Sequence, residues 1–299
     1  MIKIDNLTKT FGEVAALDNV TCEIEKGAVY GLVGSNGSGK STMLRLLSGV
    51  YRQDSGEISL DGETVWENRK TKSRIFFLGD TPFYLHQSSL NEMAKFYRMF
   101  YPSFSDEKFA ELKNIFPIDA KMKIASMSKG MQRQAILTLA LSSQPDYLFL
   151  DEAFDGLDPV IRQVLKKLLA GSVSEDGVTA IIASHNLREL EDLCDSVGLL
   201  HKGGVLLSSH LDSVKEGLHK VQAAFKQPPE EKDLDGLDII KSEKTGSLLT
   251  MVIRGERADI ISRLSVLNPL FLEAISPTLE EIFIYELEVT GYDVTQILN

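Results

Sequence analysis

The chain has 299 residues and a formal net charge of −11 at pH 7, with 43% hydrophobic and 25% charged residues. This composition is ordinary for a globular protein and argues against disordered and fibrous classes. The acidic balance argues against nucleic acid as a partner, because nonspecific nucleic-acid binding needs a basic surface. The length allows one medium domain and a smaller second one.

Cysteine usage and the N-terminal residues indicate the compartment. The two cysteines, Cys22 and Cys194, lie far apart and cannot build a dense disulfide framework or a C-x-x-C metal pair. The first residues lack the apolar core of a signal peptide, and no apolar run of about 18 residues occurs. We therefore expect a cytoplasmic chain that does not cross a membrane by itself.

The first 60 residues predict strands on either side of a phosphate-binding loop. Residues 34–41 read G-S-N-G-S-G-K-S, between a strand candidate at 28–33 and a helix candidate at 42–47. The glycines let successive backbone N–H groups point at an anion, at the positive end of a helix dipole. Lys40 would reach the β and γ phosphates, and the Ser41 hydroxyl would complete the coordination of Mg²⁺. The candidate phosphate-binding residues are Gly34, Ser35, Asn36, Gly37, Ser38, Gly39, Lys40, Ser41 and Thr42.

The middle of the chain predicts strands alternating with helices. The strands are expected at 56–62, 75–78, 147–150 and 179–184, and the helices at 89–101, 105–115, 129–142 and 159–170. The basic run 68–74 is expected to be a solvated loop. This alternation predicts an α/β fold with a parallel sheet, interrupted by a helical insert at about 82–130.

The C-terminal part predicts a separate, smaller α+β domain. Its boundary is placed between residues 211 and 212, and a turn is expected at 227–233. Strands are expected at 221–225, 239–243 and 247–253, and helices at 258–267 and 278–287. We therefore expect domains at 1–211 and 212–299.

Two carboxylates follow the apolar strand 147–150. Asp151 and Glu152 would lie at the carboxyl end of a parallel strand, where ligands bind in such sheets. With a phosphate loop present, Asp151 is expected to hold Mg²⁺ and Glu152 to polarise the attacking water as general base. Without the loop, the same pair could also cap a helix.

Residues 127–131 make the pattern specific to one family. They read M-S-K-G-M at the start of the helix 129–142, and they resemble the L-S-G-G-Q signature of ABC-type ATPases. By that resemblance, Ser128 and the Gly130 N–H would contact the γ-phosphate held by the opposite subunit. Standing alone, the stretch would read as a capped helix start.

Other elements of the family follow in order. Residues 155–159, D-G-L-D-P, resemble the D-loop that lies across the dimer interface. His185 stands where the family keeps a histidine that contacts the γ-phosphate, and Phe11 stands where an aromatic ring stacks on adenine. Asp80 takes the place of a glutamine that senses Mg²⁺ and the attacking water. Standing alone, residues 155–159 would read as an ordinary turn, His185 as a structural residue and Phe11 as a core residue.

Three departures from the family pattern predict slower hydrolysis than in typical members. Asp80 has a shorter reach than glutamine, and Lys129 and Met131 replace residues of the signature. Ala153 stands where a proline usually follows the catalytic glutamate, so the turn is less stiff.

The resemblance implies a P-loop NTPase fold of the ABC type and the function of an ATP-hydrolysing subunit that energises an ABC transporter. A tail at residues 276–283 and the signature variant resemble those of drug- and peptide-exporting systems. The implied partners are a second ATPase subunit, with a homodimer expected and a heterodimer left open, and membrane permease subunits at the inner face of the membrane. The permeases would contact residues 82–101. The alternative is a soluble ABC-type ATPase with a regulatory role outside transport.

Overall fold

The computed structural model describes residues 1–226 and 229–289, which fall into two compact units that divide between Ser208 and Ser209. The division lies within strand β10 (Gly204–His210), slightly before the boundary expected from the sequence. The turn expected at 227–233 begins with Gln227 and Pro228, which lie outside the described residues. None of the helices in the described ranges is long and apolar enough to span a bilayer.

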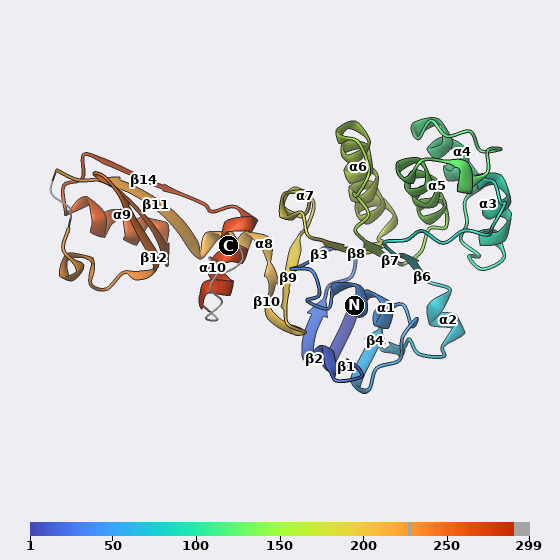
Figure 1. Cartoon of the computed structure of the whole chain (residues 1–299), viewed down its shortest axis with the longest axis horizontal. Helices are drawn as coiled ribbons and strands as arrows, with labels where there is room; N and C mark the ends of the chain where they lie inside the picture. The colour runs from blue at the N-terminus through green and yellow to red at the C-terminus, as the bar shows by residue number, and fades with distance from the viewer. Residues whose placement is uncertain (227–228, 290–299) are drawn as a thin grey trace. The chain divides into compact units, whose positions relative to one another are not determined.

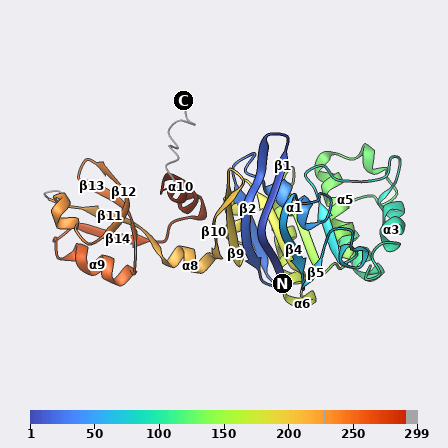
Figure 2. The ribbon, with the colours of Figure 1, turned by 90° about the horizontal axis from the view of Figure 1, so that it is seen from below.

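One layer of the first unit is a four-stranded sheet in the order β2-β1-β4-β5. Its strands are β1 (Ile2–Phe11), β2 (Val14–Ile24), β4 (Ser55–Leu60) and β5 (Glu63–Thr64). Along β1, Ile2 and Ile4 are buried while their neighbours are exposed, which is the alternation of a sheet that covers a core on one face. Figure 2 shows this layer in front of α1.

The second layer is a six-stranded sheet in the order β10-β9-β3-β8-β7-β6, in which the strands from β9 to β6 are parallel. Its further strands are β3 (Val29–Gly34), β6 (Ile75–Leu78), β7 (Tyr147–Asp151), β8 (Thr179–Ser184) and β9 (Ser196–His201). The strands β3, β7 and β8 are buried throughout, as expected for strands covered on both faces. The predicted α/β class with a parallel sheet is confirmed.

Helix α1 (Lys40–Leu47) lies between the two sheets, and its apolar face completes the core there. Helices α5 (Lys129–Ser142) and α6 (Pro159–Asp176) cover the other face of the parallel sheet (Figure 1). The remaining helices of this unit are α2 (Arg69–Lys72), α3 (Leu90–Arg98), α4 (Asp106–Ile115), the 3₁₀ turn η1 (Ile124–Ser126) and α7 (Leu187–Glu191).

Side-chain caps explain where the helices of the insert begin. Ser89 and Ser105 each accept a hydrogen bond from a backbone N–H in the first turn of α3 and α4, as the sequence predicts. The prediction of a solvated loop for the basic run 68–74 is wrong, because residues 69–72 form the short helix α2, which Asn68 caps and in which Thr71 is buried.

The second unit is an antiparallel sheet in the order β12-β13-β11-β14 with helices on both faces. Its strands are β11 (Leu218–Ala224), β12 (Asp238–Thr245), β13 (Leu248–Arg254) and β14 (Phe271–Ile275). Its helices are α8 (Leu211–Glu216), the 3₁₀ turn η2 (Glu231–Leu234), α9 (Arg257–Ser265) and α10 (Leu279–Val289). Val221 and Met251 pack towards α9, whereas Leu218 and Val252 pack towards α10. This confirms the expected α+β content of the region.

Candidate nucleotide site

The loop between β3 and α1 requires glycine at two positions. Gly37 and Gly39 have φ of 78° and 109°, in the region that other residues rarely adopt. A side chain on Gly39 would also overlap the Ala16 carbonyl. The loop therefore keeps its backbone close to β2 and presents its N–H groups at the start of α1.

Lys40 is buried at the first turn of α1. Its Nζ donates hydrogen bonds to the Gly34 carbonyl at 2.6 Å and to the Ser35 carbonyl at 3.1 Å. Burial lowers the pKa of Lys40, and the charges of Glu152 and Asp151 oppose that change. The ammonium group is thus held inside the loop, close to two carboxylates.

The loop borders a cavity of about 340 Å³ that also reaches the ends of β6 and β7. Asp80, which follows β6, and Glu152, which follows β7, both line it. The other lining residues are Val14, Ala15, Ala16, Asn36, Gly37, Ser38, Gly39, Lys40, Ser41 and Thr42. Residues from four separate parts of the sequence therefore meet around one space of the size that small ligands occupy.

Asp151 is the last residue of β7 and is 1% exposed. Among the described residues neither of its carboxylate oxygens has a hydrogen-bond partner. Burial raises the pKa of Asp151, while the nearby Ser41 hydroxyl and the Arg45 guanidinium oppose the rise. A buried carboxylate without partners beside a hydroxyl is a donor set that suits a hard cation.

Glu152 lies at a strained backbone position with a φ of 51°, which costs about 1–2 kcal/mol for a residue other than glycine. Its carboxylate Oε2 lies 3.0 Å from Nδ1 of His185 and 3.4 Å from the His185 backbone nitrogen, which donates to it. Asp155 lies in the same group, with ligand atoms of the three residues within 4.8 Å of one another. The predicted base and the predicted histidine are therefore in direct contact.

The signature segment lies apart from this cavity. Ser128 is exposed and caps α5 by accepting a hydrogen bond from the Met131 N–H at 3.3 Å. A Cβ on Gly130 would lie 2.6 Å from the Gly156 carbonyl, so Gly130 allows the signature helix to pack against the loop after β7. Neither Ser128 nor Gly130 lines the cavity of its own chain.

Asp151 and His185 are not among the residues that line the cavity, and three further candidates also lie outside its lining. Gly34 and Ser35 contribute their carbonyl groups to Lys40. Phe11 is 46% exposed on β1 and packs edge-to-face against Tyr51, with ring centroids 5.4 Å apart. Its ring is thus available at the surface beside β2, which supplies Val14 to the cavity.

Arg133 is a residue of this site that the sequence patterns missed. It lies on α5 and donates hydrogen bonds to the carbonyls of Glu152 and Asp80. The sequence carries only a weak signal for it, because Gln132 and Gln134 flank it and the mostly apolar run of α5 begins after them, at Ala135; the need of a buried arginine for partners shows only once its burial is known.

The parallel sheet, the glycine-rich loop that follows its central strand, the buried lysine and the acid pair define a P-loop nucleotide-binding domain. A family model described as ABC transporter matches residues 17–155. The chain is 32% identical over 289 residues to the ABC transporter ATP-binding protein YtrB of Bacillus subtilis, covering 95% of this chain and 97% of that protein. The chain therefore belongs to the ATP-binding proteins of ABC transporters.

Other relatives and solved structures agree. The lantibiotic transport ATP-binding protein SrtF of Streptococcus pyogenes is 34% identical over 215 residues, covering 71% of this chain and 92% of that protein. A solved ATP-binding subunit of an ABC transporter matches with a TM-score of 0.67 and 25% identity, covering 72% of this chain and 92% of that one. The predictions of family, fold and ATPase function are confirmed: the chain is an ATP-binding, ATP-hydrolysing subunit of an ABC transporter.

Proposed function

We propose that two copies of this chain enclose Mg-ATP, each copy supplying the phosphate loop for one nucleotide and the signature segment for the other. One observation carries this proposal: Ser128 and Gly130 stand at the exposed end of α5, away from the cavity that their own loop borders. The positive end of a helix there suits a phosphate brought by a second copy. ATP binding would close the pair and hydrolysis would reopen it.

Within each site, Lys40 and the loop N–H groups bind the phosphates, and Phe11 stacks on the adenine. Mg²⁺ fits the donors present, since the Asp151 oxygens are buried without partners and the Ser41 hydroxyl lies beside them. Asp80 would complete the set. When bound, the ion neutralises charge that develops on the phosphates.

Glu152 acts as general base on the attacking water, and His185 fixes the direction of its carboxylate. The contact between Nδ1 of His185 and Oε2 of Glu152 supports this pairing. The side chain of Glu152 is 16% exposed and Glu152 lines the cavity, so this residue borders the space in which a nucleophile would lie.

We further propose that the transporter exports peptide-like compounds across the cell membrane. The names of two relatives support this class of cargo, namely the lantibiotic transport protein SrtF and the bacitracin transport protein BcrA of Bacillus licheniformis. The membrane-spanning subunits are separate chains, and this subunit works at the inner face of the membrane.

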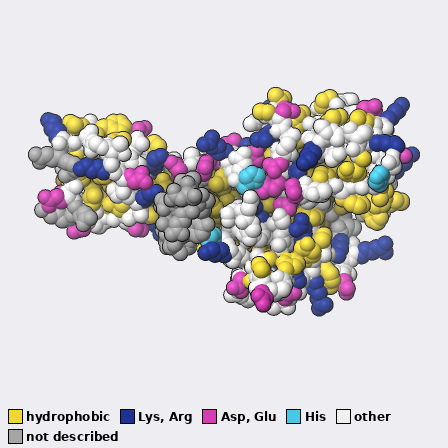
Figure 3. Space-filling model, viewed as in Figure 1, with side chains coloured by type: hydrophobic (Ala, Val, Ile, Leu, Met, Phe, Trp, Pro, Cys, Tyr) yellow, Lys and Arg dark blue, Asp and Glu magenta, His cyan; other side chains and the backbone are white. Residues whose placement is uncertain are grey.

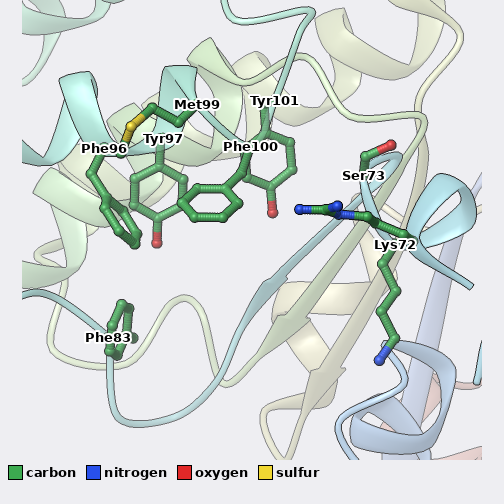
Figure 4. Close-up of a pocket in the computed structure, with 9 residues that line it drawn as sticks. Lys72, Ser73, Phe83, Phe96, Tyr97, Met99, Phe100 and Tyr101 are labelled. Carbon is green, nitrogen blue, oxygen red and sulfur yellow. The ribbon is translucent and has the colours of Figure 1, made fainter. Parts of the chain in front are cut away.

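A largely apolar pocket between the helical insert and α2, which adds Arg69, Lys72 and Ser73 to its lining, is the surface proposed for the membrane subunits. It measures about 410 Å³, and the side chains of Phe96, Tyr97, Phe100 and Tyr101 point into it from α3 and the residues after it (Figure 4). Phe83 approaches from the opposite side (Figure 4). Hydrophobic side chains gather over this part of the first unit (Figure 3). Exposed apolar patches of this kind mark interaction sites.

Turnover of the Glu152→Gln variant tests the catalytic assignment. Removing a general base is expected to lower kcat by a factor of about 10²–10⁴, while ATP binding persists. Equal turnover of the variant and the wild type would end the assignment of Glu152.

A second test addresses the membrane partner. Phe100 is 52% exposed, and Phe100→Glu is expected to abolish co-purification with a multi-spanning membrane protein without changing ATP affinity. Val50→Glu, at a position 54% exposed outside the pocket, is the control. Loss of the partner in both variants, or in neither, would contradict this surface.

A further inference from the structure

Arg133 is a buried arginine that joins the signature helix to the two acidic segments of the ATP cavity. It lies five positions after Ser128 on α5 and is 6% exposed. Its two terminal nitrogens donate to the Glu152 carbonyl and, at 2.7 Å, to the Asp80 carbonyl. The second nitrogen also lies 3.5 Å from Oδ1 of Asp80.

These hydrogen bonds hold main chain that carries cavity-lining side chains. Asp80 follows β6 and Glu152 follows β7, and both side chains line the cavity. The φ of 51° at Glu152 is a conformation that persists only when the surroundings hold it. A guanidinium is a planar fork that can bind two carbonyls in a fixed geometry, whereas a lysine ammonium acts as a point charge.

We propose that Arg133 is a positioning residue for ATP hydrolysis, which fixes the main chain of Glu152 and Asp80 to the helix that begins at Ser128. This inference rests on the proposed role of Glu152 as general base. A contact made at Ser128 by a partner's nucleotide is then coupled, through the rigid first turns of α5, to the direction of the base. The hydrogen bonds of Arg133 go to the acidic segments and not to the phosphate loop. Its loss therefore lowers kcat and leaves ATP affinity nearly unchanged.

Arg74 provides a matched control at the other ends of the same strands. It precedes β6, and its guanidinium bonds to Asp146, which precedes β7, and to Asp61. Arg74 therefore links the amino ends of β6 and β7 by hydrogen bonds, and Arg133 links the residues that follow their carboxyl ends in the same way. A purely structural role for both arginines predicts similar effects of the two substitutions.

The experiment compares Arg133→Lys, Arg133→Gln and Arg74→Lys in the full chain. The measurements are kcat and KM for ATP, ATP affinity by calorimetry, and the unfolding temperature. Both Arg133 variants are expected to lower kcat by about 10–100-fold with the ATP dissociation constant within about twofold of wild type. Arg74→Lys is expected to lower the unfolding temperature and to leave kcat unchanged.

Several results would overturn the inference. These are a normal kcat in the folded Arg133 variants, a loss of ATP affinity as large as the loss of kcat, or an equal loss of kcat in Arg74→Lys. If Arg133→Lys does not fold, the kcat and ATP affinity of Arg133→Gln, which keeps a planar donor, test the inference instead. The Glu152→Gln variant tests the proposed function separately. Normal turnover in that variant would contradict the role of Glu152 as general base, whatever the results for the Arg133 variants.

Discussion

Replacing Asp151 with asparagine is expected to stabilise the nucleotide-free protein while it removes activity. The Asp151 carboxylate is 1% exposed, and its oxygens have no hydrogen-bond partner among the described residues. A buried charge in this state costs about 3–5 kcal/mol. Attraction to the Lys40 and Arg45 charges, reduced by repulsion from Glu152 and Asp80, recovers about 2 kcal/mol at a protein-like dielectric. Asp151→Asn should therefore raise the free energy of unfolding of the first unit by about 1–3 kcal/mol.

Thermal unfolding in EDTA without nucleotide measures this effect. A gain of that size corresponds to an increase of about 2–10 °C in the unfolding temperature of a unit of this length. Mg-ATP should then stabilise the wild type more than the variant, because the variant lacks a charged ligand for the ion. An unfolding temperature of Asp151→Asn below that of wild type in EDTA would refute the reasoning.

The pH dependence gives a second measure of the same effect. Burial raises the pKa of Asp151 above its ordinary value of 3.8, so the folded state binds a proton more tightly than the unfolded state. As the pH falls from the raised pKa of the folded state to 3.8, the free energy of unfolding of the wild type therefore rises relative to that of Asp151→Asn. The variant is expected to exceed the wild type in stability by the largest amount at pH values above the raised pKa. Asp54→Asn is the control of opposite sign, because hydrogen bonds from Lys9 and Thr10 lower the pKa of Asp54 to about 2.

Three other predictions concern the nucleotide site. Lys40→Ala should weaken Mg-ATP binding by about 100-fold, since an ammonium held at the phosphates is lost; calorimetry within twofold of wild type would contradict this. Gly130→Ala brings a methyl carbon within 2.6 Å of the Gly156 carbonyl, so turnover should fall about tenfold while the affinity of a single copy for ATP is unchanged; normal turnover would contradict it. The wild type should hydrolyse ATP more slowly than typical family members, and Asp80→Gln should raise its kcat; a family-like rate in the wild type would count against this expectation.

Sequence patterns predicted the elements with strong local signals. The helix 129–142 agrees with α5 at both ends, because Ser128 caps it and apolar residues continue to its last turn. The strands around 75–78, 147–150 and 179–184 were predicted because apolar runs stand between polar turns.

The hairpin of β9 and β10 was missed, although the backbone carries a signal for it. Lys202 and Gly203 have φ of 46° and 81°, as a two-residue hairpin turn requires. β14 was also missed, since its residues Phe271–Ile275 alternate weakly and the strand is defined by pairing with β11.

In the candidate site, too, the residues with a local sequence motif were predicted and the residue defined by tertiary packing was not. Motif order placed the loop, Asp80 and Glu152 in one site, and the structure brings them around one cavity. Arg133 could not be predicted in this way, because its partners are backbone carbonyls 53 and 19 positions away, brought together by the packing of α5 on the sheet. The catalytic roles of Asp80, Glu152 and Arg133 stay predictions, which the turnover of their variants tests.

The mass of the Glu152→Gln chain in solution, with and without Mg-ATP, tests the central claim most directly. A chain of 33.2 kDa that clamps ATP between two copies should sediment as a dimer with Mg-ATP and as a monomer without it. Adding Lys40→Ala to the same chain should prevent the dimer. A mass near 33.2 kDa with Mg-ATP bound to the Glu152→Gln chain would contradict the account.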